Sequence, residues 1–387
     1  MSTDISAPPP GAPGADSVAA PFPRRRSMAR GRLAILLLGG ACLFFGVNAA
    51  LLLLDLPALL ETQRLREVHG PLMVVGFLGT VIALERAVAL RRAWAYAAPV
   101  ATGLGGILLV TPLPARTGLA IQAAGLVILV AIYAAIWDRA ASTAVAIQWL
   151  GTFLALDGTL LWIAQVPTGV LFPFLTAFLV LTIAGERLEL ARVAAPAPQV
   201  SRMLLVITAI TALACAAALL WPVPGARLFG ISLLAMVVWL VRHDVATRMI
   251  RSTGLPRYTA VNLLLGLGWL AVAGLAWAAL GPVLDGPRYD LVVHAIGLGF
   301  AMSMVLAHAP IILPAVLNRP LPYHPALYAA TVALQVTLVV RVAADVRELG
   351  LVWQAAGAGN ILALVLFVAI AAGLVVLLDE RGGLVVD

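Results

Sequence analysis

The chain has 387 residues, of which 62% are hydrophobic and 11% charged, and its mean hydropathy is +1.03. This composition excludes an ordinary soluble domain and predicts an all-α, polytopic membrane protein. The net charge of +7 is carried by arginine alone, because the chain has no lysine. The arginines stand in short loops, so we expect contact with anionic lipid and no nucleic-acid partner. The two cysteines, Cys42 and Cys215, lie in apolar segments and offer neither a disulfide framework nor a thiolate cluster.

Residues 1–31 are rich in Pro, Ala, Gly and Ser and show no hydrophobic periodicity, which predicts a disordered tail. The apolar run that follows, 33–56, is long enough to cross a bilayer and has no clear cleavage site. We therefore interpret the tail as a cytoplasmic anchor, not as a removable signal. The remainder, 32–387, is expected to form one transmembrane domain.

Twelve apolar runs have the length of a membrane span. They cover residues 33–56, 69–90, 93–113, 117–137, 143–165, 168–190, 202–221, 226–246, 258–280, 290–317, 325–346 and 351–378. With both termini in the cytoplasm, eighteen of the 25 basic residues fall on the cytoplasmic side, which satisfies the positive-inside rule. We expect twelve helices in a bacterial-type inner membrane, and no soluble catalytic domain in the short loops.

A motif recurs every four spans. GFLGTVIALER (76–86) in the second span and AFLVLTIAGER (177–187) in the sixth agree at Phe, Leu, Ile, Ala, Glu and Arg without gaps. The tenth span repeats the pattern less fully as GFAMSMVLAHA (299–309). The spacing predicts three pseudo-symmetric four-helix units, and the alternative is chance similarity between Leu- and Ala-rich helices.

Two of the five histidines are candidate metal ligands. His69 begins the second span and His294 enters the tenth from the same side, so the two imidazoles are expected at similar depth near the outer face. Two neutral imidazoles on different helices at one depth match the axial coordination of a haem iron. The alternative is that both are hydrogen-bonded residues at the rim of the membrane.

Three other ionisable residues are expected in one layer near the cytoplasmic side. Glu85 lies about 24 Å beyond His69 along its helix, and His308 lies about 21 Å beyond His294. Glu186 is the repeat equivalent of Glu85. The layer has two interpretations, a proton path or metal site, or two Glu–Arg pairs that satisfy each other near the headgroups.

Two further charged residues fall within spans. Arg341 lies toward the outer end of the eleventh span, where it can meet a haem propionate or pair with Asp345 one turn on. Asp157, in the fifth span, is the most costly charge to place in a membrane and is expected to have a partner.

The chain resembles subunit I of haem-copper oxidases, in which twelve helices form three four-helix arcs. In that family a His on the second helix, often within an HG…M stretch, and a His on the tenth hold a low-spin haem; here HGPLM (69–73) and His294 stand at those places. The chain is also similar to NnrS-type membrane proteins, which are associated with haem, copper and nitric oxide stress. The resemblance implies a b-type haem between His69 and His294 and leaves copper open, with no residues assigned to it.

The sequence departs from the oxidase pattern in two respects. The sixth and seventh spans contain no His, and the tenth lacks the second of two neighbouring histidines, so a binuclear centre and dioxygen reduction are not expected. The resemblance therefore implies a one-haem protein nearer to NnrS, with a role in electron transfer or nitric oxide handling and with respiratory or denitrification proteins as partners. The alternatives are a secondary transporter that uses Asp157 with Glu85, Glu186 and His308, and a structural subunit of a respiratory assembly.

Overall fold

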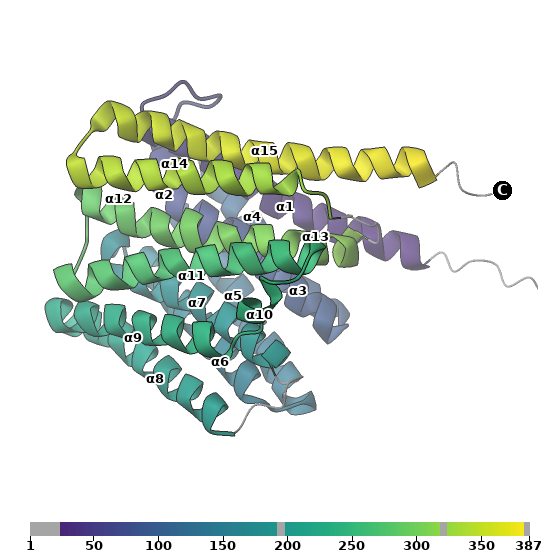
Figure 1. Cartoon of the computed structure of the whole chain (residues 1–387), viewed down its shortest axis with the longest axis horizontal. Coiled ribbons are helices and arrows are strands. Elements are labelled where there is room, and N and C mark those ends of the chain that lie inside the picture. The colour runs from purple at the N-terminus through teal and green to yellow at the C-terminus, as the bar shows by residue number, and fades with distance from the viewer. Residues whose placement is uncertain (1–23, 192–197, 318–322, 383–387) are drawn as a thin grey trace, which may run out of the picture.

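The computed structural model describes residues 24–191, 198–317 and 323–382, which contain helices and no strands. The helices run roughly parallel or antiparallel to one another in a single bundle (Figure 1). In the first half they are α1 (Arg24–Leu53), α2 (Gln63–Pro71), η1 (Leu72–Gly79), α3 (Thr80–Leu90), η2 (Ala93–Tyr96), α4 (Ala97–Leu109), α5 (Ala115–Arg139), α6 (Thr143–Ile163) and α7 (Thr168–Ala191). In the second half they are α8 (Pro198–Leu220), α9 (Pro222–His243), α10 (Ala246–Met249), α11 (Gly254–Leu280), α12 (Gly286–His294), η4 (Ala295–Met302), α13 (Ser303–Leu317), α14 (Leu327–Arg347) and α15 (Gly350–Gly382).

Eleven helices in the described ranges are long and apolar enough to cross a membrane. Two of them are composite, since α2, η1 and α3 form one span over Gln63–Leu90, and α12, η4 and α13 form another over Gly286–Pro314. The third expected span, 93–113, contains a shorter apolar helix, Ala93–Leu109. Pro112 and Pro114 follow the end of this helix. Because proline is disfavoured within a helix, the two prolines limit the length of the helix.

The expected tail lies mostly outside the described residues. Residues 1–23 are not described, and α1 begins at Arg24, within the segment 1–31.

Local chemistry accounts for several helix ends. Thr62 caps α2, Ser142 caps α6, and Arg91 ends α3 in the left-handed conformation, with φ +56°.

Polar side chains within the spans bind the loop after their own helix or a side chain of a neighbouring helix. The Nδ2 of Asn48 on α1 donates to the carbonyl oxygen of Leu60 at 2.8 Å, and Asn360 on α15 donates to Thr337 on α14 at 2.7 Å. Gln335 on α14 accepts from Trp269 on α11. Hydrogen bonds of this kind hold transmembrane helices together and satisfy groups that lipid cannot.

Both composite spans contain a π-helical segment at the same place in the repeated motif. The segment Leu72–Gly79 begins five residues before Phe77 and ends two residues after it, and Ala295–Met302 stands in the same way about Phe300. In the corresponding part of α7 the helix is α-helical throughout, and Pro173 stands where Leu72 and Ala295 stand. π-Helical turns are rare in proteins, and those that occur often lie at functional sites. The second and tenth spans therefore share a structural feature in addition to their similar sequences.

Gly299 allows the tenth span to pack closely on α11. A Cβ at Gly299 would collide with Cβ and Cγ of Trp269, whereas a Cβ at Gly297 would have no neighbour within 4 Å. We expect Gly299→Ala to lower the free energy of unfolding by about 1–3 kcal/mol, the usual cost of overpacking, and Gly297→Ala to change it little. Thermal unfolding in detergent, followed by tryptophan fluorescence, measures both, and equal midpoints for the two variants would contradict this packing.

Candidate functional site

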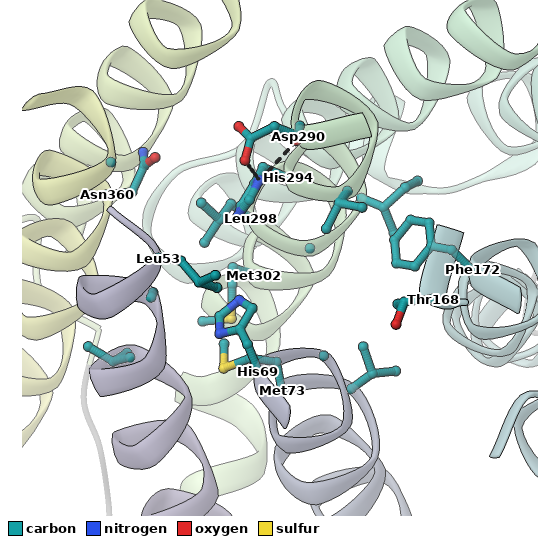
Figure 2. Close-up of a pocket in the computed structure, with 18 of the residues that line it drawn as sticks. Leu53, His69, Met73, Thr168, Phe172, Asp290, His294, Leu298, Met302 and Asn360 are labelled. Carbon is teal, nitrogen blue, oxygen red and sulfur yellow. Dashed lines mark hydrogen bonds and ion pairs between the residues drawn. The ribbon is translucent and has the colours of Figure 1, made fainter. Parts of the chain in front are cut away.

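A cavity of about 390 Å³ lies at the end of the bundle where α1 ends and α2 begins. Its walls come from α1, α6, α7, α14, α15 and the two composite spans, and most of the side chains that line it are apolar (Figure 2). His69, His294 and Arg341 all line this cavity. The structure therefore brings together three residues that stand far apart in the sequence and that were predicted as one site.

His69 is held by the neighbouring helix α1. Its Nδ1 lies 2.9 Å from the carbonyl oxygen of Gly46, which fixes the ring and assigns the proton to Nδ1. In the part of the chain that the structure describes, Nε2 of His69 makes no hydrogen bond. The imidazole thus keeps one lone pair on the nitrogen that is not tied to the backbone.

His294 is held by its own helix and by a carboxylate. Its Nδ1 lies 2.9 Å from the carbonyl oxygen of Asp290 and 3.2 Å from Oδ1 of the same residue. His243 and His308 make the same bond to the carbonyl four residues earlier, but neither lines the cavity. The cavity therefore distinguishes His294 from the other helical histidines, while the Nδ1 bond alone does not.

Asp290 is the centre of a buried polar group beside His294. Its carboxylate accepts two hydrogen bonds from Arg341, at 2.8 Å from Nε and 2.7 Å from Nη2, and one of 2.9 Å from Nε1 of Trp353. The guanidinium of Arg341 also lies over the Trp353 ring, 5.1 Å from its centroid. The ion pair of Arg341 is thus formed with Asp290 on another helix, and not with Asp345 one turn away on its own helix.

Two glycines leave room beside the histidines. Gly70 follows His69 directly, and Gly297 lies three residues after His294; both line the cavity. A Cβ at Gly297 would enter open space, so the absence of a side chain there enlarges the cavity next to an imidazole. The two imidazoles and the apolar lining thus border the same open space.

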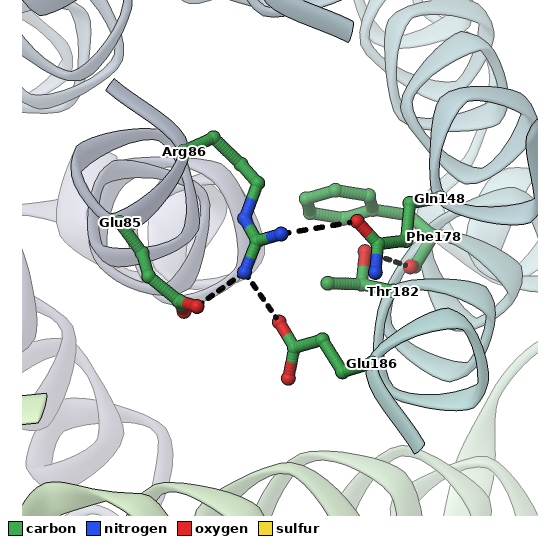
Figure 3. A network of polar contacts seen from close by, with 6 residues as sticks. All are labelled: Glu85, Arg86, Gln148, Phe178, Thr182 and Glu186. Carbon is green, nitrogen blue, oxygen red and sulfur yellow. Dashed lines mark hydrogen bonds and ion pairs between the residues drawn. The ribbon is translucent and has the colours of Figure 1, made fainter. Parts of the chain in front are cut away.

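The second predicted set divides into two parts. Arg86 lies between Glu85 and Glu186 (Figure 3), with an ion pair to each; its distance to Oε1 of Glu186 is 3.4 Å. Its other terminal nitrogen donates to Gln148 at 3.3 Å. The two carboxylates are therefore brought together through a guanidinium on one of their own helices.

His308 is not joined to this group by any contact among the described residues. It lies on α13, which packs against α3, and its Nδ1 is bonded to the carbonyl of Met304. Arg187, the repeat equivalent of Arg86, pairs with Asp244 at 3.4 Å, and both side chains are buried. Each Glu–Arg motif thus connects its helix to an acidic residue further along the chain.

Asp157 lies on an exposed face of α6 and makes no ion pair in the described part of the chain. It lies nine residues, about 14 Å along the helix, from Gln148, which contacts Arg86. A continuous polar path for a solute would require contact between Asp157 and the group of Glu85 and Glu186. The described residues do not make this contact.

Four residues of this site were not predicted from the sequence, namely Asp290, Gly46, Trp353 and Gly297. For Asp290 a signal was present, because residues four apart on a helix share a face and Asp290 precedes His294 by four. Gly46 and Trp353 act from α1 and α15 through contacts that depend on tertiary packing. No local pattern points to them.

The eleven apolar helices among the described residues are the feature of a multi-pass membrane protein, and the largely apolar cavity lies within this bundle. The chain belongs to the family described as a domain of unknown function (DUF8744), whose profile matches residues 32–376. The match begins where the transmembrane domain was expected to begin. No curated protein matches the chain.

Proposed function

We propose that the cavity binds one haem, with His69 and His294 as the axial ligands. The observation that carries this proposal is that two imidazoles on different spans face one cavity, each with Nδ1 bonded to a backbone carbonyl and Nε2 without a hydrogen bond among the described residues. Ligating histidines usually donate their other ring proton to a carbonyl or carboxylate in this way. The haem is not covalently attached in this proposal and is of b type.

Positive charge near the mouth supports the same proposal. Nη1 of Arg341 makes no hydrogen bond among the described residues, so this atom is available to a propionate even though Nε and Nη2 are held by Asp290. Arg66 also lines the cavity, and its partner Asp55 is 79% exposed. Arginines are suited to bidentate binding of carboxylates.

A haem with two imidazole ligands supplies reversible one-electron transfer. The backbone carbonyls of Gly46 and Asp290 hold the imidazoles, apolar side chains shield the cavity, and the carboxylate of Asp290 lies beside His294. We therefore propose a role in electron transfer or nitric oxide handling, as in a single-haem protein of the NnrS type, with respiratory or denitrification proteins as partners. The proposal assigns no catalytic residue and no copper.

We also propose that the short helix Ala93–Leu109 is a twelfth span and that the chain forms three four-helix units. The support is the shared register of the π-helical segments with the motif at Phe77 and Phe300. The distribution of arginine supports an inner-membrane protein with both termini in the cytoplasm. Alkaline phosphatase fusions to the 93–113 segment and to the loops on either side test the twelfth span, because a helix that does not cross would leave both flanks on one side.

The visible spectrum of the purified protein tests the haem proposal. After expression with added haem precursor we expect a Soret band, which His69→Ala and His294→Ala each shift or abolish because each removes an iron ligand. His308→Ala is the matched control, since His308 lies on the same span as His294, makes the same Nδ1 bond and does not line the cavity. A colourless native protein, or equal spectra for all three variants, would exclude the proposed ligands.

A further inference from the structure

Asp157 presents a carboxylate on the outer surface of the bundle. It lies within a spanning helix, and its neighbours on the same face of α6, Phe153 and Leu160, are exposed and apolar. A charged carboxylate in contact with hydrocarbon is unfavourable, and intramembrane charges usually pair. Among the described residues Asp157 forms no ion pair, so its carboxylate is available to a partner on another chain.

Arg227 presents the opposite charge on the surface of α9. It is exposed beside the exposed apolar residues Leu228 and Ile231, and it forms no ion pair within the described ranges. Since Arg227 lies five residues after the first residue of α9, it too falls inside a spanning helix. The two unpaired charges of opposite sign therefore lie on the two helices that flank α8.

The two charges lie at similar distances from helix ends on one side of the bundle. Asp157 is six residues, about 9 Å, before the end of α6, and Arg227 is about 8 Å after the start of α9. Both helix ends belong to the cavity side of the bundle, because Trp162 near the end of α6 lines the cavity. Phe229 near the start of α9 packs on Trp277, which packs on Phe172 of the cavity wall.

Helix α8 lies between them and is the least covered span. It packs against α9, α7 and α6 and lies at the edge of the bundle (Figure 1). Only 28% of its apolar window is buried, the smallest share among the eleven spanning helices. Its exposed side carries Val206, Ile210 and Leu213.

We propose that a second copy of this chain packs against the α6, α8 and α9 face, with Asp157 of each copy paired with Arg227 of the other. We place a two-fold axis along the membrane normal beside α8. This axis brings α6 of each copy opposite α9 of the other, so the same contact forms twice. The pairing requires that Asp157 of one copy and Arg227 of the other lie at the same depth in the membrane. The inference does not rest on the proposed haem.

Charge reversal tests the pairing. In lipid nanodiscs or vesicles, we expect a dimer whose dissociation constant rises by roughly tenfold or more in Asp157→Arg and in Arg227→Asp, and the double variant is expected to recover dimerisation. Arg288→Asp, at another exposed arginine, is the control. If a reversed charge prevents insertion of the protein into the membrane, the neutral variants Asp157→Asn and Arg227→Gln replace the charge-reversed ones in this test. A monomeric native protein, or a dimer that none of these changes weakens, would overturn the proposal.

Cross-linking locates the interface independently. Leu213 lies on the exposed side of α8, and its side chain is 67% exposed. The variant Leu213→Cys is expected to form a disulfide between two copies under mild oxidation. Val365→Cys, 56% exposed on α15, is the matched control and is expected to remain monomeric. The native cysteines are both buried. Cross-linking at Val365→Cys and not at Leu213→Cys would place the interface on another face and contradict the proposal.

Discussion

Replacement of Arg86 by leucine is expected to lower the free energy of unfolding by about 3–5 kcal/mol, the range found when one partner of a buried ion pair is removed. The side chain of Arg86 is 12% exposed and holds Glu85, Glu186 and Gln148 at once. Without it, two carboxylates remain next to each other with no counter-charge. Thermal or SDS-induced unfolding in detergent measures the loss.

Two further variants separate the contributions of this group. Glu85→Gln is expected to cost less than Arg86→Leu, because Glu85 is 30% exposed and Arg86 retains Glu186. The combination of Arg86→Leu with Glu186→Gln is expected to recover part of the loss, since it removes one of the two uncompensated carboxylates. If Arg86→Leu is as stable as the native protein, the guanidinium does not hold these helices together.

Replacement of Asp290 by alanine is expected to have a comparable effect on stability and a further effect on the site. The guanidinium of Arg341 is 7% exposed and loses its only carboxylate partner among the described residues, which costs about 3–5 kcal/mol. His294 loses the carboxylate next to Nδ1 but keeps the carbonyl bond. We expect haem to be retained roughly 10–100-fold less well, as for other residues that orient a metal ligand.

Asp55→Ala is the matched control for Asp290→Ala. Asp55 pairs with Arg66 near the same mouth of the cavity at 3.0 Å, but it is 79% exposed. Its removal is expected to cost about 0.2–1 kcal/mol, as for other exposed pairs, and to leave haem retention unchanged. Haem titration and unfolding of both variants provide the comparison, and equal losses in the two would mean that burial of the Asp290 pair has no role.

Several features of the fold could be predicted from the sequence because they depend on length and hydropathy. The apolar runs fix where the helices lie, and the constant rise of a helix fixes the relative depth of residues on one span. For this reason Glu85 and Glu186 were expected in one layer, and His69 and His294 near one depth. The limits of the third span were harder to predict, because an apolar run continues past Leu109 although the helix ends there.

The contacts between helices could not be predicted in the same way. Neighbouring residues on a helix point in different directions, so the sequence does not show that Arg86 reaches both Glu85 and the distant Glu186. Arg341 was expected near Asp345 because they share a helix face, yet Asp290 on another helix offers two well-placed oxygens. The apolar residues of α6 surround the helix, so periodicity did not reveal that Asp157 faces outward.

The spin state of the iron shows whether His69 and His294 both bind it. Electron paramagnetic resonance of the ferric protein, loaded with haem and purified from excess, distinguishes an iron held by two imidazoles from one held by a single imidazole or by none. We predict a low-spin signal of bis-imidazole type in the native protein, converted to high spin in His69→Ala and in His294→Ala and unchanged in His308→Ala. A native protein that binds no haem, or one whose haem stays high-spin, would exclude a haem held by both His69 and His294.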